Sequence, residues 1–224
     1  MRSKNMPDGR KSSGRKKSTF IEEARRRQIV RSAITTIAGA GLAQASLARI
    51  ADEVGISKSV ISYHFDGRDE LIEEIVTALL AESNRFIRSR VEQESGCPAK
   101  LRAYVEASFA FMAGHRDNFV AMVDIWGSFG TAEAKRAFNA TAYDPCRRHI
   151  ESILRKGQQD GDFRDFTPRT LAATIQGAID GVMLQWVFDE AAVDLAECAA
   201  ELTAMFDLAT RNPAGPDPVT GDGR

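Results

Sequence analysis

The sequence predicts an all-α protein, because apolar residues recur at helical spacing and no segment alternates apolar and polar residues as a half-buried strand does. Proline placement agrees with this fold class. No proline occurs between Pro7 and Pro98, so helices can run long through that interval. Pro145 and Pro168 each follow a residue with a capping side chain, so we expect a helix to begin at each of them.

The formal net charge of −1 conceals two regions of opposite sign. Through Phe65 the chain has 13 basic and 5 acidic residues, a net charge of +8. From Asp66 onward it has 17 basic and 26 acidic residues, a net charge of −9. A basic front joined to an acidic remainder is the asymmetry expected of a DNA-facing module on a body with a different role.

Several protein classes are not expected from this sequence. The three cysteines (Cys97, Cys146 and Cys198) are far apart and lack CxxC spacing, which argues against disulfides and against a structural zinc site. No apolar run approaches the ~20 residues of a membrane helix, and the basic N-terminus leads into no signal-peptide core. We therefore expect a cytoplasmic protein that uses no metal, no cofactor and no membrane segment.

Composition divides the chain into four predicted regions. Residues 1–18 contain seven basic residues and one acidic residue among glycines and serines, and are expected to form a disordered basic arm. Residues 19–66 are expected to fold as a three-helix helix-turn-helix DNA-binding domain. Residues 67–211 are expected to form a larger helical domain for ligand binding and dimerisation. Residues 212–224, with three prolines and three glycines, are expected to be a disordered tail.

The first predicted helix runs from about Phe20 to Ala38. Gly39 and Gly41 follow it directly and are suited to ending a helix. Helical spacing gives it an apolar stripe that we expect to be buried, formed by Ile29, Val30, Ala33, Ile34 and Ile37.

Two short helices are predicted next. Ser46 is expected to cap a helix over Leu47–Val54, and Gly55 provides a tight turn. Ser57 is expected to cap a third helix that ends at about Phe65. Two short helices joined by a turn of this length are typical of a helix-turn-helix motif.

The third helix has two different faces. At 100° per residue, four residues fall within about 140° of one another and carry a cation, two hydroxyls and a phenol, but no acid. Such a face suits the major groove, where hydrogen-bonding groups read base edges. A small amphipathic surface helix would have a similar polar face, so both interpretations remain open. The polar face is Lys58, Ser59, Ser62 and Tyr63, and the packing face is Val60, Ile61, His64 and Phe65.

Further candidate DNA contacts flank this helix. Ser46, Arg49 and Arg68 lie at or near helix starts, where donors can hold phosphate oxygens. The arginine cluster 25–27 and the arm 1–18 add attraction that is independent of base sequence. The arm either enters a neighbouring minor groove or only improves solubility. The predicted DNA-binding set is Arg27, Ser46, Arg49, Lys58, Ser59, Ser62, Tyr63, His64 and Arg68.

Residues 25–75 resemble the N-terminal domain of TetR-family transcriptional regulators. The resemblance rests on Ile29-Val30-x-x-Ala33, Gly41, Ser46-Leu47-x-x-Ile50-Ala51, Val54-Gly55-Ile56-Ser57, Ile61, Tyr63-His64-Phe65 and Gly67-Arg68-Asp69-Glu70-Leu71. Ser62 stands where the family most often has a tyrosine that contacts the DNA backbone. The resemblance implies an all-α homodimer that binds a palindromic operator in double-stranded DNA and releases it when a small-molecule effector binds.

Aromatic residues and methionines are frequent in the body of the chain. They either fill the core or line a cavity with a few polar groups, for which Asp124, His149, Gln176, Asp180 and Gln185 are candidates. The TetR resemblance implies an effector pocket in this region. Asp124 and Asp180 near aromatic rings would suit a cationic ligand. The predicted ligand-binding set is Phe109, Met112, Met122, Trp126, Phe129, His149, Gln176, Asp180 and Met183.

The helix that begins at Pro168 carries Ala173, Gly177 and Gly181 at successive i+4 positions. Glycine costs about 1 kcal/mol inside a helix, so its presence indicates close approach of another helix. That helix belongs either to the same subunit or to a symmetric partner. The family resemblance favours a four-helix dimer interface, and the predicted dimerisation set is Gly177, Gly181, Leu202, Met205 and Phe206.

Two other functions compete with a ligand-responsive repressor. A helical enzyme for small molecules is disfavoured, because GxSxG, HExxH and a Gly-rich phosphate loop are absent and the three histidines lack metal spacing. No catalytic residue is therefore predicted. A non-specific, architectural DNA-binding protein would use the basic arm and the helix-turn-helix, but it would not need the large apolar body. Repression in place of activation follows from the resemblance alone.

Overall fold

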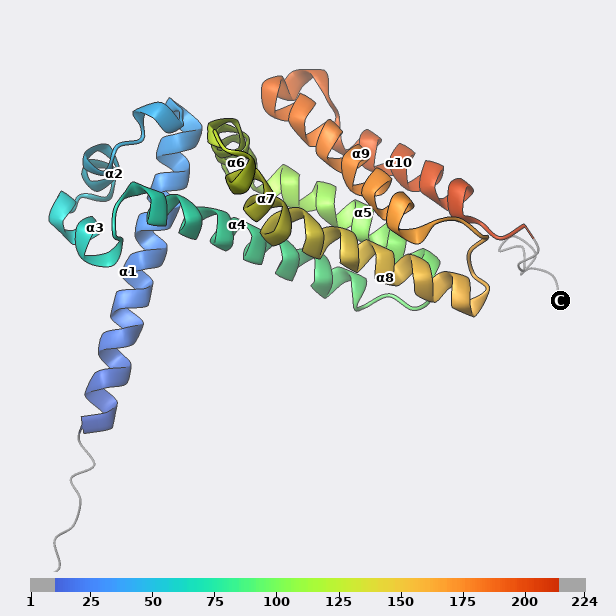
Figure 1. Ribbon diagram of the computed structural model, residues 1–224, viewed down its shortest axis with the longest axis horizontal. Coiled ribbons are helices and arrows are strands. Elements are labelled where there is room, and N and C mark those ends of the chain that lie inside the picture. Colours follow the sequence, from blue (N-terminus) through green and yellow to red (C-terminus); the bar gives the residue numbers. More distant parts are fainter. Residues whose placement is uncertain (1–10, 214–224) are drawn as a thin grey trace, which may run out of the picture. The chain divides into compact units, whose positions relative to one another are not determined.

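The computed structural model describes residues 11–213, with side chains from residue 20 onward, and Figure 1 shows that they are helical. No strand occurs in this part of the chain, where Phe163 and Arg211 form an isolated β-bridge. The predicted all-α class is confirmed. The α-helices are α1 (Lys11–Ala40), α2 (Leu47–Val54), α3 (Lys58–His64), α4 (Arg68–Val91), α5 (Cys97–Gly114), α6 (Arg116–Ser128), α7 (Ala132–Phe138), α8 (Asp144–Asp160), α9 (Pro168–Phe188) and α10 (Leu195–Thr210).

The chain forms two compact units that divide inside α4, between Ala78 and Leu79. The boundary expected from the sequence, after residue 66, lies at the start of this helix. The difference arises because Leu71 and Ile75, in the first turns of α4, are buried. Apolar residues that pack in a core belong to that core whichever helix carries them. Helix α4 therefore contributes to both units.

Helix α1 begins at Lys11 and not near Phe20. Residues 11–18, which the sequence predicts as part of a disordered arm, therefore have a helical backbone. Lysine and arginine are good helix formers, and no proline follows Pro7 to stop the helix. The rest of the predicted arm, residues 1–10, and residues 214–224 of the predicted tail lie outside the described residues.

The helix-turn-helix of the first unit follows its local sequence signals. The Ser46 hydroxyl accepts a hydrogen bond from the Arg49 amide at 3.2 Å and caps α2, as predicted. Gly55 ends α2 with a φ of +72°, in the left-handed region where glycine is favoured. The expected cap of α3 is not formed, because the Ser57 hydroxyl lies 2.7 Å from the Ser59 hydroxyl and not on a backbone amide. Fully buried side chains hold the three helices together, among them Ile29, Ile37, Ile50, Ile61 and Phe65.

The second unit is a helical bundle in which α5 packs against α8 and α10, and α9 packs against α8, α6 and α10 (Figure 1). Its core contains Leu101, Val105, Phe109, Ile150, Leu154, Ile175 and Ile179. By length and composition α9 is the one described helix that could cross a membrane. Its Ile175 and Ile179 are buried in this core, so one side of the helix packs against the rest of the unit.

Helix α7 continues into α8 through a π-helical turn, Asn139–Tyr143. Helix α8 begins at Asp144 and has Pro145 in its first turn, as predicted. The Asp144 side chain does not cap it, because the backbone is already helical in the π-helical turn before it. Pro168 does begin α9 as predicted, although the Thr167 side chain makes no capping hydrogen bond.

Candidate functional site

The polar face of α3 is open to solvent in the first unit. Lys58, Ser59 and Ser62 are exposed, and Tyr63 is 74 % exposed. Ile61 on the opposite face is fully buried. His64 is half-buried and its ring meets the Tyr63 ring edge-on at 5.1 Å. The helix therefore presents hydrogen-bonding groups outward while an apolar side fixes it to the domain.

Arg26 fixes the end of α3, a role that the sequence reasoning missed. Its guanidinium lies 4.2 Å from the centre of the Phe65 ring and donates to the His64 carbonyl oxygen. It also pairs with Glu70 at 3.3 Å and Glu74 at 3.2 Å, both on α4. The Asp66 amide lowers the pKa of Glu70 by donating to its carboxylate. One sequence signal could have indicated this role: Glu70 and Glu74 are four residues apart, so they lie on one face of a helix and can both pair with one arginine of the cluster 25–27.

The other arginines differ in their availability for DNA. Arg27 and Arg49 are exposed, and Arg27 lies 3.8 Å from Glu23. Arg68, predicted as a phosphate contact, donates instead to the Leu42 carbonyl oxygen and is half-buried. The structure assigns it an internal contact because the start of α4 packs beside the 3-10 turn Leu42–Gln44.

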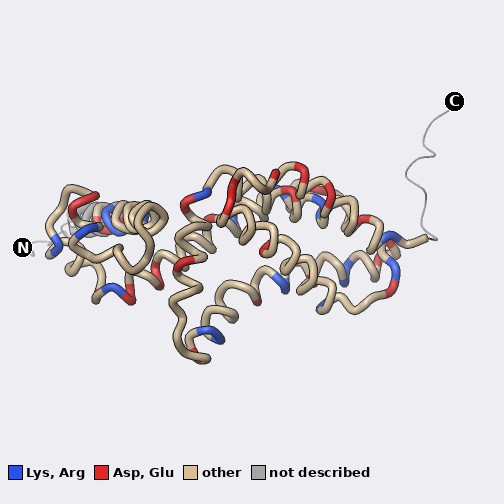
Figure 2. The backbone as a smooth tube through the Cα atoms, turned by 90° about the horizontal axis from the view of Figure 1, so that it is seen from above, with Lys and Arg blue, Asp and Glu red and all other residues tan. Residues whose placement is uncertain are grey.

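The positive charge is not spread evenly over the first unit. Seven of the 13 basic residues up to Phe65 lie in residues 1–18. Residues 20–65 hold six basic and four acidic residues, and Figure 2 shows both signs along the described helices. Sequence-independent attraction to phosphate is therefore expected mainly from the N-terminal segment.

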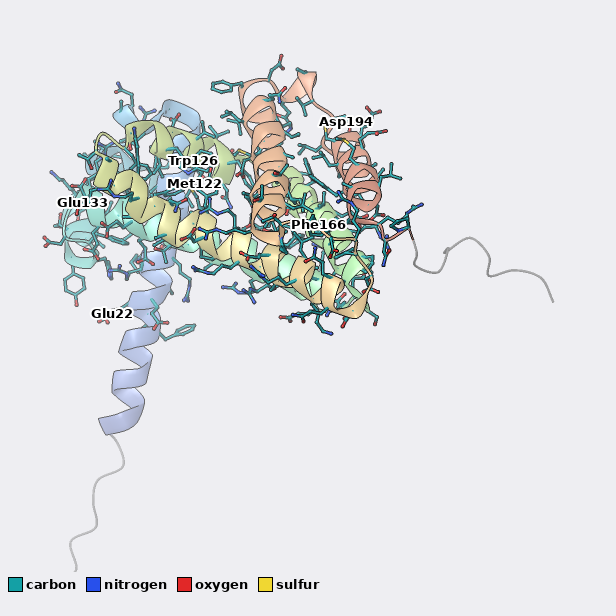
Figure 3. All side chains as sticks on the ribbon, turned by 45° about the vertical axis from the view of Figure 1, so that its right-hand side comes forward. Glu22, Met122, Trp126, Glu133, Phe166 and Asp194 are labelled. Carbon is teal, nitrogen blue, oxygen red and sulfur yellow. The ribbon has the colours of Figure 1, made fainter. Side chains whose placement is uncertain are left out.

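A cavity of about 100 Å³ lies inside the second unit. Residues from α4, α5, α6, α7, α8, α9 and the π-helical turn line it. Met122 and Trp126 lie one turn apart on α6 (Figure 3). Six residues of the predicted ligand-binding set line this cavity: Met112, Met122, Trp126, Gln176, Asp180 and Met183.

The other three residues of that set lie elsewhere. Phe109 is buried in the helical core. The Phe129 ring lies tilted against Phe138, with 5.2 Å between the ring centroids, and does not line the cavity. The His149 ring meets the Tyr104 ring edge-on, with 5.4 Å between the ring centroids, and His149 does not line the cavity. Only one side of each helix reaches the cavity, and residue type does not reveal which side that is. The polar candidates Asp124 and Gln185 also lie outside the lining.

Aromatic rings form one wall of the cavity. Trp126 lies 5.8 Å from Phe138 and 5.9 Å from Tyr143, measured between ring centroids. The sequence reasoning missed both tyrosines of the lining, Tyr104 and Tyr143, because it searched clusters of Phe, Trp and Met. Phe138 and Tyr143 are five residues apart, and the π-helical turn brings them onto one side at 5.9 Å.

Asp180 is the one acidic residue in the lining. The Gln176 amide donates to its carboxylate at 2.9 Å, and no lysine or arginine among the described residues forms an ion pair with it. Burial raises the pKa of Asp180 to about 6, against the opposing effects of the Gln176 hydrogen bond and of Arg147. The Arg147 guanidinium is itself bound to Asp144 and Asn139. The carboxylate therefore lacks a partner of opposite charge.

A short chain of polar groups supports this carboxylate. The Tyr104 hydroxyl donates to the Gln176 side-chain oxygen at 3.3 Å, which leaves the Gln176 amide nitrogen to face Asp180. Burial raises the pKa values of Tyr104 and Cys146. Both groups are therefore neutral near pH 7, and Asp180 carries the acidic charge of the lining.

Both α9 and α10 expose large apolar side chains. Phe188 is 77 % exposed, Met205 58 % and Leu208 68 %. Apart from the nearby backbone of α9 itself, no described atom lies within 4 Å of the position where a Cβ would stand on Gly177 or Gly181. Among the predicted dimerisation residues, Leu202 is half-buried, whereas Phe206 belongs to the core of its own unit. Phe206 is thus better explained by packing within one chain.

One group of side chains has the composition of a metal site. Cys97, Asp160 and Asp162 bring their ligand atoms within 4.8 Å of one another. Each of these residues also has a local contact: Asp162 accepts the Cys97 amide at 3.4 Å, and Asp160 pairs with Lys156. Burial and the two aspartates raise the pKa of the Cys97 thiol, which disfavours the thiolate that metals bind.

Two family models match the chain. Residues 29–75 match the bacterial regulatory proteins of the tetR family, and residues 98–211 match the C-terminal domain of BetI-type transcriptional repressors. The regulator BetI 1 of Chromohalobacter salexigens is 33 % identical over 90 residues, which are 40 % of this chain and 45 % of that protein. BetI of Cronobacter sakazakii is 27 % identical over 110 residues, 48 % of this chain and 54 % of that protein. The chain thus spans about half the length of these curated relatives.

Solved structures share the fold. A transcriptional regulator from Saccharomonospora viridis in complex with choline has a TM-score of 0.75 at 22 % identity, over 85 % of this chain and 99 % of that chain. A transcriptional regulator from Pseudomonas aeruginosa PAO1 has a TM-score of 0.73 at 24 % identity, over 84 % and 90 %. FadR from Bacillus subtilis in complex with stearoyl-CoA has a TM-score of 0.72 at 18 % identity, over 80 % and 95 %.

Proposed function

Because the chain belongs to the TetR family of bacterial transcriptional regulators, with a C-terminal domain of the BetI repressor type, we propose that it is a repressor that responds to a small cation. As a dimer it binds a palindromic operator, and it leaves the DNA when the cation occupies the cavity of the second unit. The observation that carries this proposal is the half-buried Asp180 carboxylate in the cavity lining, which forms no ion pair with a described lysine or arginine. Members of this family are regulators and not enzymes.

The chemistry of the cavity favours a ligand with one positive charge. A buried carboxylate without a partner is costly, and a bound cation would remove that cost. The faces of Trp126, Phe138 and Tyr143 attract a cation through their ring quadrupoles. The volume of about 100 Å³ suits a small ligand. The choline bound to the S. viridis regulator supports a quaternary ammonium ion.

The two units would be coupled through the helix that they share. Leu71 of α4 is buried in the first unit, and Leu79 of the same helix lines the cavity in the second. A ligand that binds more tightly to one conformation of α4 would shift the population of the regulator toward that conformation. A dimer needs its two α3 helices in major grooves about 34–36 Å apart, so a modest change in their spacing would weaken DNA binding.

A titration with choline and its uncharged analogue 3,3-dimethylbutan-1-ol tests the effector class. The two molecules have nearly the same shape, and only choline carries a charge. We expect choline to change tryptophan fluorescence, through Trp126, with an affinity at least about 30-fold higher than that of the alcohol. Operator DNA recovered from a random pool should be palindromic, and choline should release it. If the alcohol binds as tightly as choline, the cationic effector is wrong.

Lys58 is expected to contribute to operator binding. The residue is exposed on the polar face of α3, where its ammonium group can reach phosphate or a base edge. We expect Lys58→Ala to weaken operator binding by about 10-fold. If the contact is to phosphate, the slope of the logarithm of the binding constant against the logarithm of the salt concentration should become shallower by about one. Lys135→Ala, at an exposed position of α7, is the matched control. Equal operator affinities of the two variants would refute the assignment of α3 as the reading helix.

A further inference from the structure

We propose that the cavity exchanges a proton for its cationic ligand, so that the repressor responds to the effector and to acidity at the same residue. In the empty protein at mildly acidic pH, Asp180 is a neutral carboxylic acid. When the cation enters, the O–H bond of Asp180 breaks and the proton leaves to solvent, and the carboxylate pairs with the cation. This inference rests on the proposed cationic effector and adds a regulation of the same site.

The geometry allows only one proton-bearing group to respond in this way. The Gln176 amide of α9 donates a hydrogen bond to the Asp180 carboxylate. The Tyr104 hydroxyl of α5 donates to the side-chain oxygen of Gln176. Tyr143 on the π-helical turn and Cys146 on α8 complete the titratable groups that interact with Asp180. Burial raises the pKa of Tyr143 to about 12, and also raises that of Cys146, so neither group ionises at mildly acidic pH.

The positive charge nearby does not replace the ligand. Arg147 of α8 lowers the pKa of Asp180, but burial outweighs it and leaves that pKa at about 6. Arg147 keeps its own contacts with Asp144 and Asn139. Burial and Arg88 lower the pKa of His149, and its side chain does not line the cavity.

Exchange keeps the cavity neutral in both states. The empty cavity holds a neutral acid at low pH, and the occupied cavity holds a carboxylate paired with a cation. Neither state buries a net charge, which is the costly alternative in an apolar site. Below the pKa of the empty site each bound cation displaces one proton. The apparent Kd should then rise about tenfold for each pH unit below about 6.

Gln176 is the positioning residue that sets the pH below which cation binding weakens. Its amide donates to the Asp180 carboxylate at 2.9 Å, and the Tyr104 hydroxyl bound to its oxygen fixes its orientation. A donated hydrogen bond stabilises the ionised form. Replacing Gln176 with leucine removes the donor and should move the pH profile of binding upward by about one unit. A residue that only packs would lower affinity equally at every pH.

Calorimetric titration with choline chloride at about pH 5 and pH 8, in two buffers of different ionisation enthalpy, tests the exchange. We expect release of close to one proton per choline at the lower pH and almost none at the higher pH. Gln176→Leu should raise the pH midpoint, whereas Gln159→Leu, at an exposed position of α8, should leave it unchanged. Binding with no proton release and a flat Kd would overturn the exchange while leaving the cationic effector intact.

A measurement on the empty protein separates the two proposals further. Folded Asp180 binds its proton more tightly than the unfolded chain, because burial raises its pKa from 3.8 to about 6. The resulting stabilisation is present at low pH and is lost as the pH rises to about 6. The melting temperature of the wild type should therefore fall relative to Asp180→Asn between about pH 4 and pH 7. A constant difference would overturn the exchange even if choline binds. Absence of choline binding at pH 8, with the expected melting curves, would instead refute the proposed effector and with it the exchange.

Discussion

Asp180→Asn is expected to stabilise the empty protein at pH 7.5 while it removes the response to choline. Asparagine has the size of aspartate, and its side-chain oxygen still accepts the Gln176 hydrogen bond of 2.9 Å. The substitution eliminates a negative charge in an apolar cavity. The rise of the Asp180 pKa to about 6 reflects the free energy needed to ionise this group in the folded protein. That shift corresponds to an upper bound of about 3 kcal/mol, and we expect a gain of about 1–3 kcal/mol in the free energy of unfolding. Choline affinity should fall about 100-fold.

Thermal denaturation and a choline titration of the same preparation measure both effects. Asp165→Asn, at an exposed loop position, is the matched control and should change neither quantity appreciably. Operator binding by Asp180→Asn should persist at choline concentrations that release the wild type. A variant that is less stable than the wild type would contradict the burial of an unpaired charge. A variant that keeps its choline affinity would show that the effector binds elsewhere.

Gly177→Leu is expected to separate the dimer without harming the single chain. Apart from the nearby backbone of its own helix, no described atom lies within 4 Å of the position of its Cβ, and the residue is exposed, so we expect the isolated subunit to accept a larger side chain there. Leucine also favours the helix by nearly 1 kcal/mol relative to glycine. At a close contact between two α9 helices the same side chain would overpack the interface. We expect the dimer Kd to rise at least 100-fold, and binding to a palindromic operator to weaken with it.

Sedimentation equilibrium and operator binding measure this result. Gly127→Leu is the matched control, because this exposed glycine of α6 also has no described atom within 4 Å of its Cβ position. The control should remain dimeric with unchanged operator affinity. A dimer unaffected by Gly177→Leu would move the interface away from this side of α9. Loss of folding in both variants would contradict the open space found at the two glycines.

The helix-turn-helix was predictable because its signals are local. Ser46 caps α2 and Gly55 ends it at a positive φ, so both residues act within a few positions of their place in the sequence. The two faces of α3 follow from helical periodicity alone, and Ile61 is buried while Tyr63 is exposed. By contrast, Arg26 and Arg27 are neighbours in the sequence with opposite surroundings. Only the packing of α1 against α3 and α4 turns Arg26 inward.

The cavity was only partly predictable because it depends on how distant helices are rotated. Met112 lines it whereas Phe109, three residues earlier on the same helix, belongs to the core. Tyr143 lines the cavity because it lies in a π-helical turn, and the sequence contains no signal that predicts this turn. The sequence by itself determined an all-α chain, its helix-turn-helix and its family, because these depend on spacing and on short-range capping. Only the tertiary structure decided that Asp180 lines an apolar cavity without an ion-pair partner among the described residues, because a cavity requires helices brought together from across the bundle.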